Sequence, residues 1–291
     1  MSGVRVAWAA VLLGACAHAP PPRLSPCAEN VCLSWTRGQN EIAFAVENRN
    51  PVPVTLLADF PVRENLEPTA PIPIRTVIPA AQRIEPVRFS RADPLRADRI
   101  EATTLVHLGS VETIPDPAAR YAIPFGGAEP RVLGPGVDGG ITHKGVERYA
   151  FDWVMPIGTP VLAAREGIVV QVIDGFTKGG FDERLRTQWN LVVVGHADGT
   201  LASYGHLSKG IPVRIGDHVV RGQRLGLSGN TGYTQGPHLH FHVGKILDDQ
   251  VEGYTVPIRF DDGSRDGFVP ELGSRYGPEV EVAPVGSTRL R

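Results

Sequence analysis

Three histidines alternate with apolar residues in the run 237–243, which reads Pro-His-Leu-His-Phe-His-Val. Side chains of a β-strand point to opposite faces in turn, so a strand here places His238, His240 and His242 on one face. The apolar residues between them take the other face, which suits a hydrophobic core. Three imidazoles on one face can present metal ligands, or one ligand beside a proton-transfer group. Taken alone, the pattern also fits a surface run without function.

A carboxylate interrupts an apolar strand candidate earlier in the chain. Asp152 lies in the run Tyr-Ala-Phe-Asp-Trp-Val at 149–154. A buried carboxylate needs a partner, and a metal ion or an arginine would serve. His143 lies nine residues before Asp152, and His206 follows another strand candidate. Two histidines and one carboxylate form the three-ligand set of catalytic zinc sites, and further histidines nearby can act as general base or stabilise an oxyanion.

Composition limits the classes of protein to which the chain can belong. Its 291 residues suggest one or two domains, and 42% hydrophobic with 21% charged residues argue against wholesale disorder. The 33 glycines and 26 prolines favour many turns and short strands over a helix bundle. A net charge of −2 argues against a nucleic-acid partner. No apolar run reaches the about 18–20 residues that span a bilayer, so no transmembrane helix is predicted.

Short strand candidates separated by proline and glycine predict an all-β, mostly antiparallel protein. The first half resembles a small β-sandwich, and it contains no set of residues that would be catalytic. The second half contains seven of the nine histidines. The predicted segments are a signal peptide at 1–15, a proline-rich tether at 16–26, an N-terminal β domain at 27–118, a second β domain at 119–262, and a C-terminal loop and tail at 263–291.

The N-terminus has the pattern of an export signal. Residues 1–15 carry one charge, Arg5, followed by an apolar run, as in a secretory signal peptide. The run ends in Leu-Gly-Ala before Cys16, which resembles the bacterial lipobox and implies a lipidated Cys16 that anchors the mature chain to a membrane. Ala17, in place of aspartate, is similar to lipoproteins of the outer membrane that face the periplasm. An ordinary signal peptide with a chance cysteine is the alternative.

Two further cysteines follow the tether. Cys27 and Cys32 are candidates for a disulfide, because an exported chain meets an oxidising compartment. Two free thiols or a metal pair are the alternatives. A structural zinc site would need a second cysteine pair, which the chain lacks.

In their order along the chain, these motifs resemble the lysostaphin/LytM family of zinc metalloendopeptidases. The resemblance covers about residues 121–262. It rests on His143, Asp-Trp-Val-Met-Pro-Ile-Gly-Thr-Pro-Val at 152–161, Gly-His-Leu at 205–207, Gly-Asn-Thr-Gly at 229–232, and Gly-Pro-His-Leu-His-Phe at 236–241. It implies a LytM-type β-sheet peptidase domain that hydrolyses peptide bonds of bacterial peptidoglycan, in cross-links or in stem peptides.

The resemblance also implies a role for each of five residues. His143, Asp152 and His240 would bind one zinc ion per chain. His206 and His238 would be the catalytic histidines, which move the proton and stabilise the tetrahedral oxyanion. Peptidoglycan peptides would be the substrate, and other cell-wall enzymes are candidate partners.

One departure from the family pattern concerns the spacing of the first two ligands. Many members place the aspartate four residues after the histidine, whereas Asp152 follows His143 by nine. Glu147 occupies the four-residue position and is a rival ligand. A loop insertion would move His143 without altering its chemistry, which favours His143 with Asp152. His242 lies beyond the family's histidine pair, either behind the ligands or at the edge of the groove.

Two other classes of function remain open at this point. Some members of the family have lost ligands and instead activate a cell-wall amidase, although no expected ligand is missing here. A structural lipoprotein whose histidines hold metal is a third hypothesis. The scissile bond is not specified by the sequence, and a cross-link between D-alanine and diaminopimelate follows from the localisation argument alone.

Overall fold

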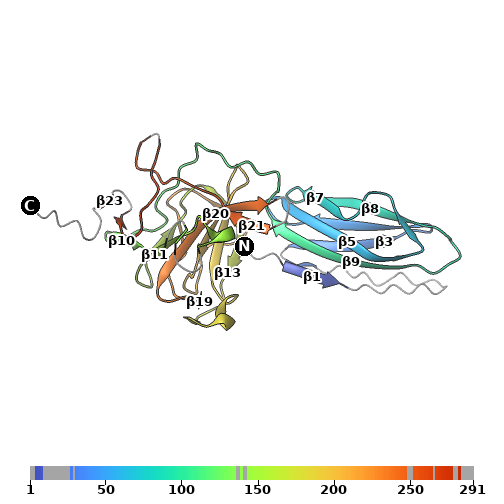
Figure 1. Ribbon diagram of the computed structural model, residues 1–291, viewed down its shortest axis with the longest axis horizontal. Coiled ribbons are helices and arrows are strands. Elements are labelled where there is room, and N and C mark those ends of the chain that lie inside the picture. The colour runs from blue at the N-terminus through green and yellow to red at the C-terminus, as the bar shows by residue number, and fades with distance from the viewer. Residues whose placement is uncertain are drawn as a thin grey trace, which may run out of the picture. The chain divides into compact units, whose positions relative to one another are not determined.

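The computed structural model describes residues 4–8, 27–28, 30–135, 138–139, 143–247, 252–264, 266–277 and 281–282. The chain forms two compact units (Figure 1). Unit 1 comprises Met1–Glu112 and Ile246–Gly253, and unit 2 comprises Thr113–Lys245 and Tyr254–Arg291, so the division falls slightly earlier than the predicted one at 118/119. The all-β, mostly antiparallel class is confirmed, and the described residues contain no α-helix. Among them, no helix has the length and apolar character needed to cross a membrane.

The first unit is a β-sandwich. A four-stranded sheet has the order β1-β9-β5-β7, and a five-stranded sheet has the order β2-β3-β4-β8-β6. Phe60 of the first sheet packs against Phe44 and Phe89 of the second, with ring centroids 5.4 and 4.9 Å apart. The two inner faces therefore share one core. The strands are β1 (Val4–Trp8), β2 (Cys27–Ala28), β3 (Val31–Arg37), β4 (Glu41–Asn48), β5 (Val54–Glu64), β6 (Leu66–Pro68), β7 (Ile74–Ile78), β8 (Arg83–Arg91) and β9 (Arg99–Leu108).

The structure bears on two of the N-terminal predictions, the signal peptide and the disulfide. Strand β1 lies inside the predicted signal peptide and pairs with β9 at the edge of its sheet, so cleavage before Cys16 would leave β9 as the edge strand. Cys16 and the whole of the predicted tether, residues 16–26, lie outside the described residues. Cys27 and Cys32 face each other across β2 and β3 and form a disulfide with an S–S distance of 2.08 Å.

The second unit is built on a large sheet with the strand order β17-β13-β15-β16-β20-β11-β10-β22-β23, in which β21 also pairs with β20. Strands β12 and β18, and β14 and β19, form two small ribbons beside it. The elements are β10 (Arg131–Leu133), 3₁₀ helix η1 (Gly145–Glu147), β11 (Phe151–Val154), β12 (Pro160–Leu162), β13 (Gly167–Ile173), β14 (Gly179–Gly180), 3₁₀ helix η2 (Glu183–Leu185), β15 (Leu191–Gly195), β16 (Leu201–Gly205), β17 (His218–Val219), β18 (Arg224–Leu227), β19 (Gly232–Tyr233), β20 (His238–Leu247), β21 (Glu252–Thr255), β22 (Arg275–Tyr276) and β23 (Glu281–Val282).

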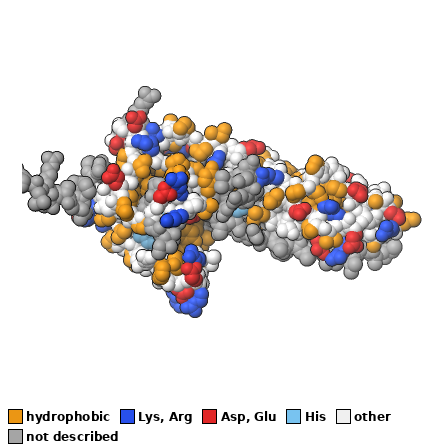
Figure 2. All heavy atoms as spheres, in the orientation of Figure 1, with side chains coloured by type: hydrophobic (Ala, Val, Ile, Leu, Met, Phe, Trp, Pro, Cys, Tyr) orange, Lys and Arg blue, Asp and Glu red, His pale blue; other side chains and the backbone are white. Residues whose placement is uncertain are grey.

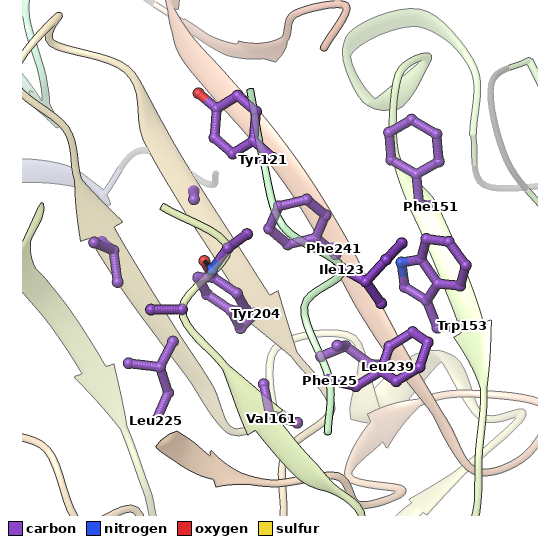
Figure 3. Close-up of a cluster of buried hydrophobic side chains, with 14 of the residues drawn as sticks. Tyr121, Ile123, Phe125, Phe151, Trp153, Val161, Tyr204, Leu225, Leu239 and Phe241 are labelled. Carbon is purple, nitrogen blue, oxygen red and sulfur yellow. Dashed lines mark hydrogen bonds between the residues drawn. The ribbon is translucent and has the colours of Figure 1, made fainter. Parts of the chain in front are cut away.

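The core of the second unit lies on one face of this sheet. Strand β20 runs between β11 and β16, and its residues Leu239 and Phe241 are fully buried. They belong to the same apolar cluster as Trp153 of β11 and Tyr204 of β16 (Figure 3). The predicted alternation of β20 therefore holds for its apolar residues. This packing turns the histidines of the strand toward the opposite face.

The C-terminal part of the second unit differs from the prediction. Strand β21 ends at Thr255. The segment 263–291 was expected to be loop and tail, yet β22 pairs with β10. Its Tyr276 is buried and packs edge-on against Trp153 at 5.7 Å between ring centroids. A strand of two residues is too short to show an alternating pattern in the sequence. The position of β22 follows instead from the burial of the Tyr276 ring.

Candidate metal centre

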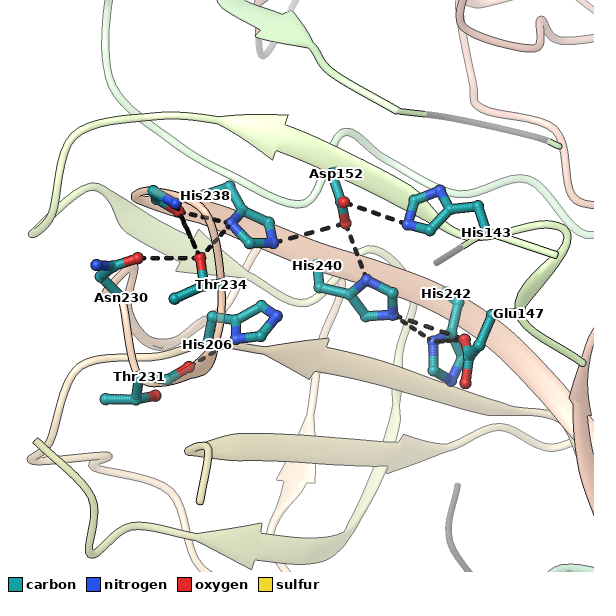
Figure 4. A network of polar contacts seen from close by, with 11 residues as sticks. His143, Glu147, Asp152, His206, Asn230, Thr231, Thr234, His238, His240 and His242 are labelled. Atoms are coloured by element: carbon teal, nitrogen blue, oxygen red, sulfur yellow. Dashed lines mark hydrogen bonds and ion pairs between the residues drawn. The ribbon is translucent and has the colours of Figure 1, made fainter. Parts of the chain in front are cut away.

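Pairing of β20 with its two neighbours brings the candidate residues together (Figure 4). Asp152 of β11 lies directly opposite His240 in the antiparallel register, and the His240 Nδ1 is 2.9 Å from Asp152 Oδ1. On the other side of β20, Gly205 of β16 lies opposite His240. His206 follows Gly205 at the end of β16, and His238 begins β20. Side chains from three adjacent strands thus meet at one end of the sheet.

His143 reaches the same place from a loop. Its imidazole is fully buried, and its Nε2 lies 3.2 Å from Asp152 Oδ2. The 3₁₀ helix η1 occupies the gap between these two residues. Thr255 holds the loop, because its hydroxyl donates to the Val146 carbonyl and accepts the Tyr149 N–H, both at 2.9 Å. The longer spacing is therefore absorbed by an ordered turn that keeps His143 beside Asp152.

The donor atoms of these residues suit a zinc ion. One nitrogen each from His143 and His240 and one oxygen from Asp152 lie within 4.8 Å of one another. Zinc bonds of about 2.0–2.2 Å in a tetrahedron place neighbouring ligand atoms about 3.3 Å apart. The separations of 2.9 Å from His240 Nδ1 to Asp152 Oδ1 and 3.2 Å from His143 Nε2 to Asp152 Oδ2 run to the two oxygens of the carboxylate, and both are close to this value. Two imidazoles with one carboxylate are also a donor set that zinc prefers.

The electrostatics of the cluster favour a positive charge. Burial opposes ionisation of Asp152, but hydrogen bonds from His143 and His240 outweigh it and hold the pKa of the carboxyl below its usual range. Burial also opposes a charge on His240. Hydrogen bonds to Asp152 and Glu147 outweigh that effect and raise the pKa of His240 to about 10. A cation at this position is therefore stabilised by two carboxylates in a buried setting.

His206 and His238 form a separate pair beside these residues, with ring centroids 4.5 Å apart. The Nδ1 of His206 is 2.6 Å from the Thr231 carbonyl oxygen, and that of His238 is 2.8 Å from the Gly236 carbonyl oxygen. A carbonyl oxygen only accepts, so each Nδ1 carries the proton and each Nε2 has a lone pair in the neutral ring. Burial lowers the pKa of His206 to about 3 and also lowers that of His238, so both rings are neutral near pH 7.

His206 adopts a backbone conformation that is unusual for a residue with a side chain. Its φ is +60°, in the left-handed region, where strain at functional sites tends to accumulate. The preceding Gly205 allows Trp189 to approach, since a Cβ there would lie 2.2 Å from the indole. The ring of Trp189 packs 5.2 Å from His206 and 6.0 Å from His240. Trp189 was not identified from the sequence, because no local pattern links it to the histidines. Thr231 belongs to the Gly-Asn-Thr-Gly motif at 229–232, but its contact with His206 was not predicted.

Glu147 and His242 lie on the far side of His240. The His240 Nε2 is 3.0 Å from His242 Nδ1 and 3.7 Å from Glu147 Oε2, and the last two atoms are 3.3 Å apart. The three side chains also form a second group of donor atoms within 4.8 Å, which shares His240 with the first. His242 is buried, so it lies behind the cluster and does not form the edge of a groove. Glu147 thus faces the Nε2 of His240, whereas Asp152 faces its Nδ1.

Residues 144–252 match the model of Peptidase family M23, a range that begins one residue after His143. The peptidoglycan DD-endopeptidase ShyA of Vibrio cholerae is 41% identical over 115 residues, which are 40% of this chain and 23% of ShyA. Lysostaphin of Staphylococcus staphylolyticus is 39% identical over 107 residues, 36% of this chain and 19% of lysostaphin. The match thus spans less than a quarter of the length of these relatives.

A solved structure, the catalytic domain of lysostaphin from Staphylococcus simulans, is 31% identical, with 43% of this chain and 78% of that chain covered and a TM-score of 0.27. The sequence match and the site together define the class of the second unit. It is a Peptidase family M23 domain of the lysostaphin/LytM type.

Proposed function

We propose that the second unit is a zinc-dependent endopeptidase that hydrolyses peptide bonds of bacterial peptidoglycan. The observation that carries the proposal is the convergence of His143, Asp152 and His240 on one point with His206 and His238 beside it. ShyA is named as a peptidoglycan DD-endopeptidase, which supports the substrate class. No residue of the catalytic set is missing, which argues against a regulator without activity.

His143, Asp152 and His240 would hold one zinc ion through Nε2, the carboxylate and Nδ1. The ion would polarise the scissile carbonyl and lower the pKa of the attacking water. The protein sets the orientation of these ligands: Asp152 lies between the two imidazoles, and Trp189 packs against the ring of His240. Three protein ligands leave a fourth position open, as catalysis requires.

His206 and His238 would transfer protons during the reaction. Because backbone carbonyls accept from both Nδ1 atoms, the two Nε2 atoms remain to act at the reaction centre. A neutral imidazole can take a proton from water and, once protonated, donate a hydrogen bond to the tetrahedral oxyanion or a proton to the leaving amine. The depressed pKa of His206 keeps its ring in the base form near pH 7.

Digestion of purified peptidoglycan tests the proposed function. The protein that begins at residue 17 is incubated with sacculi, with and without a chelator, and the products are identified by mass spectrometry. We expect chelator-sensitive cleavage of stem peptides or cross-links, and the products identify the bond. If zinc is bound but no bond is cut, the chain is not an endopeptidase, and stimulation of a purified cell-wall amidase then tests the regulator hypothesis.

We predict that loss of Glu147 weakens zinc binding. With Nδ1 on the metal, His240 Nε2–H faces His242 Nδ1 at 3.0 Å. The half-buried carboxylate of Glu147 lies 3.7 Å from the same Nε2 and 3.3 Å from His242 Nδ1, and it supports this pair. Removal of such a partner lowers metal affinity by about 10–100-fold. Glu147→Ala should show this loss in a chelator competition assay, Glu147→Gln a smaller one, and the exposed Glu129→Ala none. If Glu147 were itself the ligand in place of His143, His143→Ala would leave the affinity unchanged.

We also propose that the chain is exported and anchored through lipid on Cys16, at the periplasmic face of the outer membrane. The lipobox-like run supports this, and the Cys27–Cys32 disulfide suits an oxidising compartment. Cys16→Ser should lose incorporation of labelled palmitate and move from the membrane fraction to the soluble fraction. Cys27→Ser, the matched control, should remain labelled. A Cys16→Ser protein that stays labelled would contradict the anchor.

A further inference from the structure

A cavity of about 880 Å³ opens beside the catalytic histidine pair. Its walls come from residues 176–188, 208–209 and 230–231, together with Ile157, all within the second unit. A volume of this size is typical of sites that hold a small ligand or several residues of a peptide. The polar cluster around the metal ligands lies outside its lining.

Thr231 links the wall of the cavity to the histidine pair. This residue lines the cavity, and its carbonyl oxygen also holds His206 Nδ1 at 2.6 Å. Ser208, two residues after His206, lines the cavity as well. Figure 4 shows Thr231 beyond His206 and away from the metal ligands. Residues that flank the scissile bond of a peptide held at the histidines would enter this cavity.

Two lysines, Lys178 and Lys209, line the cavity on different segments. Buried polar groups hold the segment that carries Lys178. Asn190 is fully buried, and its side chain accepts from the Phe176 N–H at 2.9 Å and donates to the Leu207 carbonyl at 3.1 Å. The carbonyl of Lys178 accepts the Gly232 N–H at 2.9 Å, next to the β14–β19 ribbon. Such a cavity is largely pre-formed, so binding would require little ordering of the backbone.

On the other wall, Asp174 fixes the turn that follows Lys209. Its carboxylate accepts the N–H of Gly210 at 2.9 Å and that of Ile211 at 3.0 Å. Both lysine-bearing segments are therefore anchored through their backbones. Lys178 and Lys209 both line the cavity, and both are exposed.

The lining of the cavity has a net positive charge, because it contains Lys178, Arg184 and Lys209 but one carboxylate. Its one carboxylate, Asp182, is already bonded to Arg184, with N–O distances of 3.0 and 2.6 Å. Figure 2 shows charges of both signs on the part of this unit that carries η2. Within the described residues, Lys178 and Lys209 make no salt bridge. Two ammonium groups in a cleft attract an anion, and a compact lysine charge suits a carboxylate.

We propose that Lys178 and Lys209 make this cavity a subsite for a carboxylate of the substrate peptide. The inference rests on the proposed endopeptidase function. Phe176 and Leu185 supply apolar surface for the aliphatic arm of such a group. A peptide with free carboxyl groups on aliphatic side chains or at its end would pair with both lysines. An uncharged glycine bridge would leave the ammonium groups without a partner, so the cavity selects acidic stem peptides.

Paired substrates test the subsite. One is a cross-linked peptide dimer with free carboxyl groups, and the other is the same dimer with those groups converted to amides. We expect the unmodified protein to prefer the acid in kcat/KM by about tenfold. Lys178→Gln with Lys209→Gln should raise KM for the acid by a similar factor, leave kcat unchanged and leave the amide unaffected. Arg214→Gln with Arg224→Gln removes the same charge from exposed positions outside the lining and should change neither.

Equal rates on acid and amide, or an equal loss on both in the lysine variant, would overturn the subsite. If the unmodified protein cleaves neither dimer, the endopeptidase proposal fails, and calorimetric titration of the two dimers decides the subsite separately. Tighter binding of the acid that is lost in the lysine variant would support it. Equal affinities would reject it.

Discussion

Replacement of His240 by alanine is expected to abolish both zinc binding and peptidoglycan cleavage. His240 contributes one of the three donor atoms around the metal position, and its ring contacts Trp189 and Asp152. Without His240, only His143 and Asp152 remain of the three metal ligands. Metal content and cleavage of sacculi should therefore fall to background together.

The control for this variant is His218→Ala, which removes an exposed histidine from the same unit. It should keep zinc and full activity. Circular dichroism checks that the His240→Ala protein remains folded, as we expect from the apolar face of β20, which is unchanged. A folded His240→Ala protein with full activity would show that the metal site is assigned to the wrong residues.

Replacement of His206 or His238 by alanine is expected to separate chemistry from metal binding. Neither ring belongs to the donor group around Asp152, and each is held through Nδ1 by a backbone carbonyl. Zinc content should stay near one ion per chain. Loss of a proton-transfer or oxyanion group lowers the rate by about 10²–10⁴-fold.

The measurement is kcat on a defined cross-linked dimer, with zinc determined on the same samples. The double variant should lose less than the product of the two single losses, because the two rings act on one reaction centre. Loss of zinc in either variant would make that histidine a ligand. Unchanged kcat would remove it from the mechanism.

The part of the site that follows strand periodicity could be predicted from the sequence. Alternation along β20 placed Leu239 in the core and His240 on the opposite face. The spacing between His143 and Asp152 was ambiguous, because sequence does not show that η1 folds the extra residues into an ordered turn. That His143, Asp152 and His240 lie together, although they are distant in the chain, was predicted from the resemblance to the family and not from local pattern.

Other contacts depend on long-range packing, which local pattern does not encode. Glu147 was weighed as a rival to His143, but it faces the Nε2 of His240. Trp189 is brought to His206 only because Gly205 leaves room for the indole. Tyr276 was assigned to a tail, but its ring is buried in the core, and the two-residue strand β22 that contains it pairs with β10.

Titration of zinc into the metal-stripped protein tests the central claim most directly. Bound zinc and the rate of peptidoglycan cleavage are followed in the same samples. We predict that both rise together and that the rate reaches its plateau at one zinc per chain. A rate that is fully present without bound metal, or absent at full occupancy, would contradict a zinc-dependent endopeptidase.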